Sequence, residues 1–232
     1  MTRLVIAATE AEGNELITTL QCMKGPQAFG WYIYYGTHDQ KSVVLIICGP
    51  GMANAAAATA LGIERYQIDH VYNVGVCGVY ADDDSLIGTA VAGEYALFAD
   101  TGAAIEHGFM MLQDMALPLA HLMNSGPVFN AIALSLERIS AAMPRCIFST
   151  VAAISASPLV AKTLFERCRT LYPPALICED MESAAVALIA ARAGLPCTVI
   201  RGISNQCGNR DRRYWKFTEA AAAAQNALLT CW

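Results

Sequence analysis

Three polar side chains follow apolar segments that have the length of a buried strand, and their types suit acid–base chemistry and ligand binding. They are Glu12, Glu182 and Asn205. In open α/β sheets, ligands bind outside the carboxyl ends of the strands, so the sequence predicts that these side chains converge on one crevice. Two carboxylates and an amide around such a crevice could bind a small polar ligand and move a proton.

Each of these residues also has an ordinary structural explanation. Thr9 followed by Glu12 fits a capping box, in which the Glu12 carboxylate accepts a hydrogen bond from the backbone amide of Thr9. Glu and Asn are common at the ends of helices and in turns, where they cap free backbone groups or are solvated. A functional interpretation therefore depends on the three residues lying together.

The apolar pattern alternates between strand-length and helix-length segments. Predicted strands cover residues 3–8, 31–35, 43–48, 70–76, 89–98, 145–153, 175–178 and 196–203. Predicted helices cover residues 9–20, 52–65, 130–139, 159–169, 181–193 and 217–232. This alternation predicts the α/β class, as a single domain over residues 1–232 with a three-layer α/β/α arrangement and a mixed, mostly parallel sheet. The segment 99–130 has no clear pattern and is expected to be a long irregular loop, either functional or disordered.

The composition limits the partners and the cellular setting. The 232 residues are 55% hydrophobic and 15% charged with a net charge of −5, which excludes a disordered chain and offers no basic surface to nucleic acid. No apolar run is long and charge-free enough to span a membrane, and the N-terminus lacks the cleavage site of a signal peptide, which favours a cytoplasmic protein. The high apolar content favours a homodimer or a higher homo-oligomer.

The cysteines and histidines do not indicate a metal site. The nine cysteines are an odd number, contain no CxxC pair and lie mostly in apolar segments, which predicts buried free thiols. The same interpretation is favoured for Cys77 and Cys207 over a nucleophilic role. The four histidines have no ligand-like spacing, so the sequence predicts a protein without metal or cofactor.

Two glycine motifs follow predicted strands, at residues 49–51 and 75–78. The first has the strand–glycine–helix setting of a phosphate cradle, but no acid stands where a bound ribose would need one, and the chain has no GK[ST] sequence. We therefore expect these glycines to let the backbone approach a ligand or a neighbouring strand.

Taken together, these motifs resemble the purine nucleoside phosphorylase/nucleosidase superfamily along the whole chain. TEAE at residues 9–12 resembles the acidic motif of the methylthioadenosine/S-adenosylhomocysteine nucleosidases, and CGPGMANAA (48–56) and NVGVCG (73–78) resemble their glycine loops. EDMESAAVA (179–187) resembles the ribose-binding motif, VIRGIS (199–204) the base-binding strand, and the segment around Ile154 one that flanks the base. EDMES combined with RGISNQCGNRDRRYW is more similar to the futalosine hydrolases, which act in menaquinone biosynthesis. The Met–Glu and ISN motifs carry the resemblance, since glycine loops alone are not specific.

The resemblance implies an enzyme that breaks the N-glycosidic bond of a purine nucleoside through an oxocarbenium-like transition state. In this scheme Glu12 takes a proton from water, and Asn205 with Ser204 stabilises the leaving base. Glu182 binds the ribose hydroxyls and Met181 packs against the sugar. Cys77, Gly78 and Ile154 complete the expected substrate-binding residues.

Two features decide which relative the resemblance favours. The adenine-specific nucleosidases have Asp at the position of Asn205, whereas an amide suits the 6-oxo group and N7 of hypoxanthine. A phosphate site needs arginine or a free helix N-terminus, whereas the first motif carries Glu10 and Glu12, so water is the expected nucleophile. Futalosine hydrolysis is therefore the leading expectation. The alternatives are a nucleosidase for methylthioadenosine or aminodeoxyfutalosine, a phosphorylase, and a non-catalytic nucleoside-binding protein.

Futalosine carries a carboxyphenyl ketone at its 5′ end, for which the chain offers an apolar segment and a basic cluster. We expect residues 109–111 to help house the aryl group, and Arg210 or Arg212 to bind its carboxylate. The alternative is that the apolar side chains pack in an interface between subunits and that the arginines are solvated.

Overall fold

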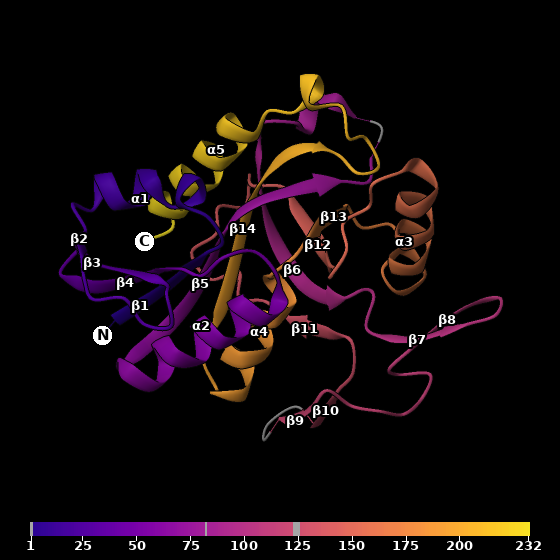
Figure 1. Cartoon of the computed structure of the whole chain (residues 1–232), viewed down its shortest axis with the longest axis horizontal. Coiled ribbons are helices and arrows are strands. Elements are labelled where there is room, and N and C mark those ends of the chain that lie inside the picture. Colours follow the sequence, from indigo (N-terminus) through magenta and orange to yellow (C-terminus); the bar gives the residue numbers. More distant parts are fainter. Residues whose placement is uncertain (1, 82, 123–125) are drawn as a thin grey trace.

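A large mixed sheet forms the centre of the computed structural model, which describes residues 2–81, 83–122 and 126–232 (Figure 1). Its strands, with the two small hairpins outside it, are β1 (Thr2–Ala7), β2 (Met23–Lys24), β3 (Tyr32–His38), β4 (Lys41–Ile47), β5 (Ile68–Val79), β6 (Ala90–Phe98), β7 (Gly102–Ile105), β8 (Gly108–Met111), β9 (Ala120–Leu122), β10 (Gly126–Val128), β11 (Ala131–Ala133), β12 (Arg145–Thr150), β13 (Ile177–Asp180) and β14 (Cys197–Gln206). The helices are α1 (Asn14–Thr19), α2 (Met52–Arg65), α3 (Pro158–Leu171), α4 (Ser183–Arg192) and α5 (Phe217–Thr230).

Helices cover both faces of the sheet. The alanine-rich helices α2 and α4 pack against each other and bury small side chains such as Ala55, Ala58 and Ala187 in one core. On the other face, α1 and α5 bury Leu16, Ala224 and similar side chains in a second core (Figure 1). Small residues on these helices allow their backbones to approach the strands closely. The predicted α/β class and the mixed sheet are confirmed.

The sequence had suggested an open sheet. The sheet instead closes on itself at one end. Strand β14 pairs in parallel with β5 and antiparallel with β6, and the sheet continues from β6 through β12 and β13 back to β5. Register shifts between Ile203 and Asn205 in β14, and between Cys146 and Ile147 in β12, mark bulges in this ring. Bulges increase local twist and bending, so long strands can close into a barrel. The alternation of helices and strands does not reveal such closure.

The segment after β6 differs most from the sequence prediction. The predicted helix over residues 130–139 is wrong, because β11 (Ala131–Ala133) pairs with the edge of β6 instead. The buried Asn130 side chain fixes this segment by donating to the backbone oxygens of Phe98 and Thr101, at 3.2 and 3.1 Å. Tertiary pairing thus overrides the helical periodicity. The irregular stretch before it contains the hairpins β7–β8 and β9–β10.

No helix among the described residues is long and apolar enough to cross a membrane. All nine cysteines are free thiols, and only Cys22 and Cys207 are not fully buried.

Candidate active site

A cavity of about 200 Å³ opens where the sheet enters the closed barrel. Nine of the ten site residues expected from the sequence line it, namely Glu12, Cys77, Gly78, Ile154, Met181, Glu182, Ser204, Asn205 and Arg210. They come from β5, β14, the 3-10 turn that follows β1 and the loops after β12, β13 and β14. Strands β13 and β14 are consecutive in the chain but not adjacent in the sheet, because β5 lies between them and pairs with both. The cavity is therefore built around β5.

Glu12 is held by three hydrogen bonds and is 4% exposed. It ends a 3-10 turn (Glu10–Glu12) that precedes α1, where a continuous helix had been expected. Its Oε2 accepts from the backbone N–H of Thr9 at 3.0 Å and from the Thr9 hydroxyl at 2.7 Å. Its Oε1 accepts from the N–H of Val76 on β5 at 2.9 Å. The structural bond to Thr9 is thus present, and the contact to β5 brings the same carboxylate into the cavity.

Glu182 lies just before α4 and binds two groups that are distant in the sequence. Its Oε1 accepts from the N–H of Gly51 at 2.8 Å, at the amino end of α2. Its Oε2 lies 3.2 Å from Nη1 of Arg201. The glycine loop at residues 49–51 therefore serves a carboxylate of the protein itself, since a helix N-terminus attracts negative charge.

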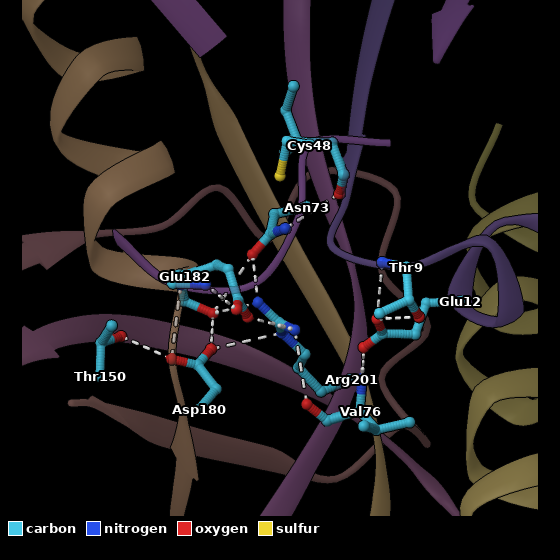
Figure 2. Close-up of polar contacts among 12 residues, drawn as sticks. Thr9, Glu12, Cys48, Asn73, Val76, Thr150, Asp180, Glu182 and Arg201 are labelled. Atoms are coloured by element: carbon cyan, nitrogen blue, oxygen red, sulfur yellow. Dashed lines mark hydrogen bonds and ion pairs between the residues drawn. The ribbon is translucent and has the colours of Figure 1, made fainter. Parts of the chain in front are cut away.

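Arg201 is the main site residue for which the sequence had suggested no role. It is fully buried in the middle of β14, and its guanidinium lies between Asp180 and Glu182 on one side and the backbone of Val76 on the other (Figure 2). Nη2 also donates to Oδ1 of Asn73 at 2.6 Å. The sequence did contain a signal for Arg201, namely a charged residue within an apolar strand. Such an arginine can be buried only if acids pair with it.

Burial and charge act in opposite directions on the pKa values of this cluster. Burial disfavours the charged guanidinium of Arg201, but the carboxylates of Asp180, Glu182 and Glu12 together raise its pKa above the usual value. Burial raises the pKa of Asp180 to about 6, and Arg201 only partly offsets this effect. Asp180 is further bound by the hydroxyls of Thr150, at 2.7 Å, and Ser183. Arg201 therefore remains charged, and Asp180 can change its protonation state at mildly acidic pH.

Asn205 lies at the bulge in β14, directly across from Gly78 of β5. Its Oδ1 accepts from the Ser204 hydroxyl at 2.7 Å, and its Nδ2 donates to the backbone oxygen of Gln206 at 2.8 Å. The Ser204 hydroxyl also lies 3.1 Å from the backbone oxygen of Cys77. An amide held in this way has one N–H left for a ligand in the cavity.

The thiols near the cavity are not activated. Burial raises the pKa of Cys77 and of Cys207 well above the ordinary value. A nucleophilic cysteine needs the opposite shift, so these side chains act as small apolar groups in the wall.

Arg210 and Arg212 differ in position. Arg210 lines the cavity, and its guanidinium lies 4.8 Å from the ring centre of Trp215. Arg212 is exposed, and it does not line the cavity in the described part of the chain.

A second cavity, of about 510 Å³, shares Asn205 and Trp215 with the first. The site therefore continues past Trp215 toward solvent.

Residues 109–111, which were expected to help house the aryl group, lie away from the cavity in the described part of the chain. Phe109 packs under the guanidinium of Arg167, 3.8 Å from it, and Met111 is buried in a third core beside α3. Neither residue lines the cavity within the part of the chain that the structure describes.

The fold and this cavity define an α/β protein whose pocket is lined by fixed carboxylates and an amide, with a buried arginine paired to two of the carboxylates. The family model of the phosphorylase superfamily matches residues 2–231, and the chain belongs to this superfamily.

Two relatives that the chain resembles are nucleosidases. The chain is 30% identical over 189 residues to the futalosine hydrolase of Streptomyces coelicolor (strain ATCC BAA-471 / A3(2) / M145), covering 79% of this chain and 76% of that protein. It is also 30% identical over 209 residues to the 5′-methylthioadenosine/S-adenosylhomocysteine nucleosidase of Shewanella sp. (strain MR-7), covering 88% and 84%. The protein is thus a nucleosidase-family hydrolase of N-glycosyl compounds.

Solved structures share the fold. The 5′-methylthioadenosine/S-adenosylhomocysteine nucleosidase of S. pneumoniae, solved with a transition-state inhibitor, superposes with a TM-score of 0.80 at 20% identity over 100% of this chain and 98% of that one. A futalosine hydrolase mutant of Helicobacter pylori strain 26695 gives 0.79 at 17% identity over 100% and 98%.

Proposed function

We propose that this protein hydrolyses the N-glycosidic bond of futalosine, releasing hypoxanthine and dehypoxanthine futalosine in menaquinone biosynthesis. The observation that carries the proposal is the meeting of Glu12, Glu182 and Asn205 around one cavity. The similarity to the Streptomyces coelicolor futalosine hydrolase supports it. The chemistry needs no metal or cofactor, because carboxylates and an amide supply the proton transfer and the charge stabilisation.

In the proposed reaction Glu12 acts as the general base. Its hydrogen bonds to Thr9 and Val76 fix the carboxylate, and a water bound to it is directed at the anomeric carbon of the ribose. Glu182 accepts hydrogen bonds from the ribose hydroxyls while Gly51 and Arg201 hold it in place. Carboxylates beside the sugar also stabilise the positive charge that develops on the ring in the transition state.

Water is favoured over phosphate by the charges around the cavity. The amino end of α2, which could bind phosphate, is already engaged by Glu182. The buried Arg201 is balanced by Asp180 and Glu182. A phosphate beside Glu12 would therefore meet carboxylates, and Arg201 is not free to neutralise it.

Asn205 favours hypoxanthine as the leaving base. Its remaining N–H can donate to N7 or to the 6-oxo oxygen of the purine, and both of these are acceptors. The 6-amino group of adenine is a donor, so a donor at that position is mismatched and is disfavoured.

Arg210, rather than Arg212, is proposed to bind the carboxylate of the 5′ group. Stacking on Trp215 orients the planar guanidinium and leaves its N–H groups free for a carboxylate. Arg210→Ala should raise the Michaelis constant for futalosine about tenfold with little change in kcat, whereas Arg212→Ala is the matched control. Equal Michaelis constants for both variants and the wild type would remove this part of the proposal.

The decisive experiment supplies purified protein with futalosine, aminodeoxyfutalosine, inosine and methylthioadenosine, with and without phosphate, and identifies the free base and the sugar. We expect hypoxanthine from futalosine at a rate that phosphate does not change. Adenine release from methylthioadenosine or aminodeoxyfutalosine would favour the second candidate, a nucleosidase for those substrates. The similarity to the Shewanella nucleosidase supports this candidate. Formation of a ribose 1-phosphate would indicate a phosphorylase, and binding without turnover would indicate a nucleoside-binding protein.

A further inference from the structure

A carboxylate and an amide face each other across a glycine in the wall of the cavity. Strands β13, β5 and β14 lie side by side, and Gly78 of β5 is directly opposite both Glu179 of β13 and Asn205 of β14. Residues directly opposite one another project from the same face of a sheet. Neighbouring strands are about 4.8 Å apart, so roughly 10 Å separates the α-carbons of Glu179 and Asn205.

Gly78 lies at the floor of a slot between Glu179 and Asn205 and leaves room there for the Cys207 side chain. A Cβ at Gly78 would lie 2.8 Å from the Cys207 sulfur and 3.6 Å from Nδ2 of Asn205. Both Glu179 and Asn205 line the cavity, together with Ile154 and Ser155 from the loop after β12. A flat ring in the cavity can therefore contact both a carboxylate and an amide.

Glu179 is 6% exposed, and neutral groups hold it in place. Its Oε2 accepts from the hydroxyls of Ser155 and Tyr80, both at 2.5 Å. Its Oε1 accepts from the backbone N–H of Ser155 at 2.8 Å, and no other donor to Oε1 is found within residues 2–81, 83–122 and 126–232. A carboxylate has about four acceptor positions, so Oε1 can accept one more hydrogen bond.

The two sides of the slot offer opposite hydrogen-bonding groups. Asn205 presents a donor, because its oxygen is engaged by Ser204 and one of its N–H groups by Gln206. Glu179 presents an acceptor. A 6-oxopurine has acceptors at N7 and O6 and a donor at N1–H, so it matches both sides. Adenine shares the N7 acceptor and can match Asn205 there, but its N1 carries a lone pair in place of the N–H, so it does not match Glu179.

We infer that Glu179 is a specificity-determining residue whose carboxylate accepts the N1–H of a 6-oxopurine and disfavours adenine. This inference rests on the proposed function, since it concerns the base of the nucleoside that is cleaved. Glu179 touches the base but takes no part in the transfer of the proton to or from water.

The first test changes the ligand and leaves the protein intact. The dissociation constants of hypoxanthine, 1-methylhypoxanthine and adenine are measured by calorimetry with the wild-type protein. Loss of the N1–H should weaken binding on the order of 10- to 100-fold, the value of a hydrogen bond to a charged group. Equal affinities for hypoxanthine and 1-methylhypoxanthine would overturn the inference.

The second test changes the carboxylate. Glu179→Leu removes the acceptor, and Glu179→Gln keeps a neutral one. The readout is the ratio of kcat/KM for two nucleosides that share their 5′ group and differ only in carrying hypoxanthine or adenine. We expect the ratio to fall about 10- to 100-fold in Glu179→Leu and to an intermediate value in Glu179→Gln. Glu106→Gln, whose side chain is 89% exposed, is the matched control.

The outcomes separate this inference from the proposed function. A purely structural role of Glu179 would lower the rates for both nucleosides equally and leave the ratio unchanged, which would overturn the inference alone. If the wild type releases no base from any nucleoside, the proposed function itself fails. If the leucine variant does not fold, the glutamine variant and the binding of 1-methylhypoxanthine still decide.

Discussion

At the scale of single residues, Arg201 links the acids of the cavity to one another. It pairs with Asp180 at 3.3 Å and with Glu182 at 3.2 Å, and all three side chains are buried. Removing one partner of a buried ion pair leaves an uncompensated charge, which is far more costly than the pair itself. The position of Glu182 in the cavity therefore depends on Arg201 as well as on its own backbone.

Glu12→Gln should separate catalysis from binding. The amide can keep the hydrogen bond from Val76, but it cannot take a proton from water. We expect kcat to fall by roughly 10²–10⁴-fold, the usual contribution of a general base, while hypoxanthine affinity changes less than about threefold. Base release and calorimetry measure the two effects. A variant that keeps its wild-type kcat would exclude Glu12 as the base.

Asp180 should make the free energy of unfolding depend on pH. Its pKa is about 6 in the folded protein, raised by burial, against an ordinary value of 3.8. Between these values the folded protein holds a proton that the unfolded chain has lost. Proton linkage then stabilises the fold below about pH 4, and this stabilisation is lost as the pH rises through 6.

The measurement compares the wild type with Asp180→Asn, because the amide does not titrate. The difference between the free energies of unfolding of wild type and variant should fall as the pH rises from 4 to 6, by at most about 1.4 kcal/mol per pH unit. Denaturant titrations at several pH values give this difference. A constant difference across the range would show that Asp180 does not titrate there.

At the scale of elements, β5 positions the site because it continues from the sheet into the barrel. Gly75 lies opposite Arg201 in the register of β5 and β14. A Cβ at Gly75 would collide with Nη1 of Arg201 and would lie 2.5 Å from Oε1 of Glu12. A glycine at this point therefore lets two charged groups approach the same strand.

Gly75→Ala should damage activity more than stability, because the atoms it displaces are the ends of side chains in the cavity. A displacement of about 1 Å can cost roughly 10²-fold in kcat. Gly93→Ala is the control, since its Cβ would lie 2.5 Å from Leu134 and 2.7 Å from Phe148, in the core. This control should lower the melting temperature while the folded fraction keeps its kcat. The prediction is wrong if both variants lose activity only in proportion to stability.

Most elements on the covered faces of the sheet could be predicted from local patterns. Helix α2 has the predicted bounds, and α3, α4 and α5 differ by one or two residues at an end, because caps and apolar periodicity are local properties. The strand β11 could not be predicted, because it forms only by pairing with the edge of β6. Likewise Asn205 was expected after a strand, yet it lies inside β14 at a bulge.

At the scale of the whole molecule, the nine free cysteines offer a test of how closely the chain packs. Seven are buried and two, Cys22 and Cys207, are partly exposed, and burial raises the pKa of these two thiols as well. The native protein should react with a thiol reagent at no more than two positions at pH 7, and at nine in denaturant. Rapid reaction of more than two thiols in the native protein would contradict this packing.

The sequence by itself determined the α/β class, the acid and amide residues that line the cavity, and the superfamily that these motifs indicate. Such properties depend on periodicity and on residue types within short segments. Only the tertiary structure decided that the sheet closes into a barrel, that Arg201 lies between the acids, and that Glu179 faces Asn205 across Gly78. These features depend on which strands pair and in which register, and pairing between distant segments has no local signal in the chain.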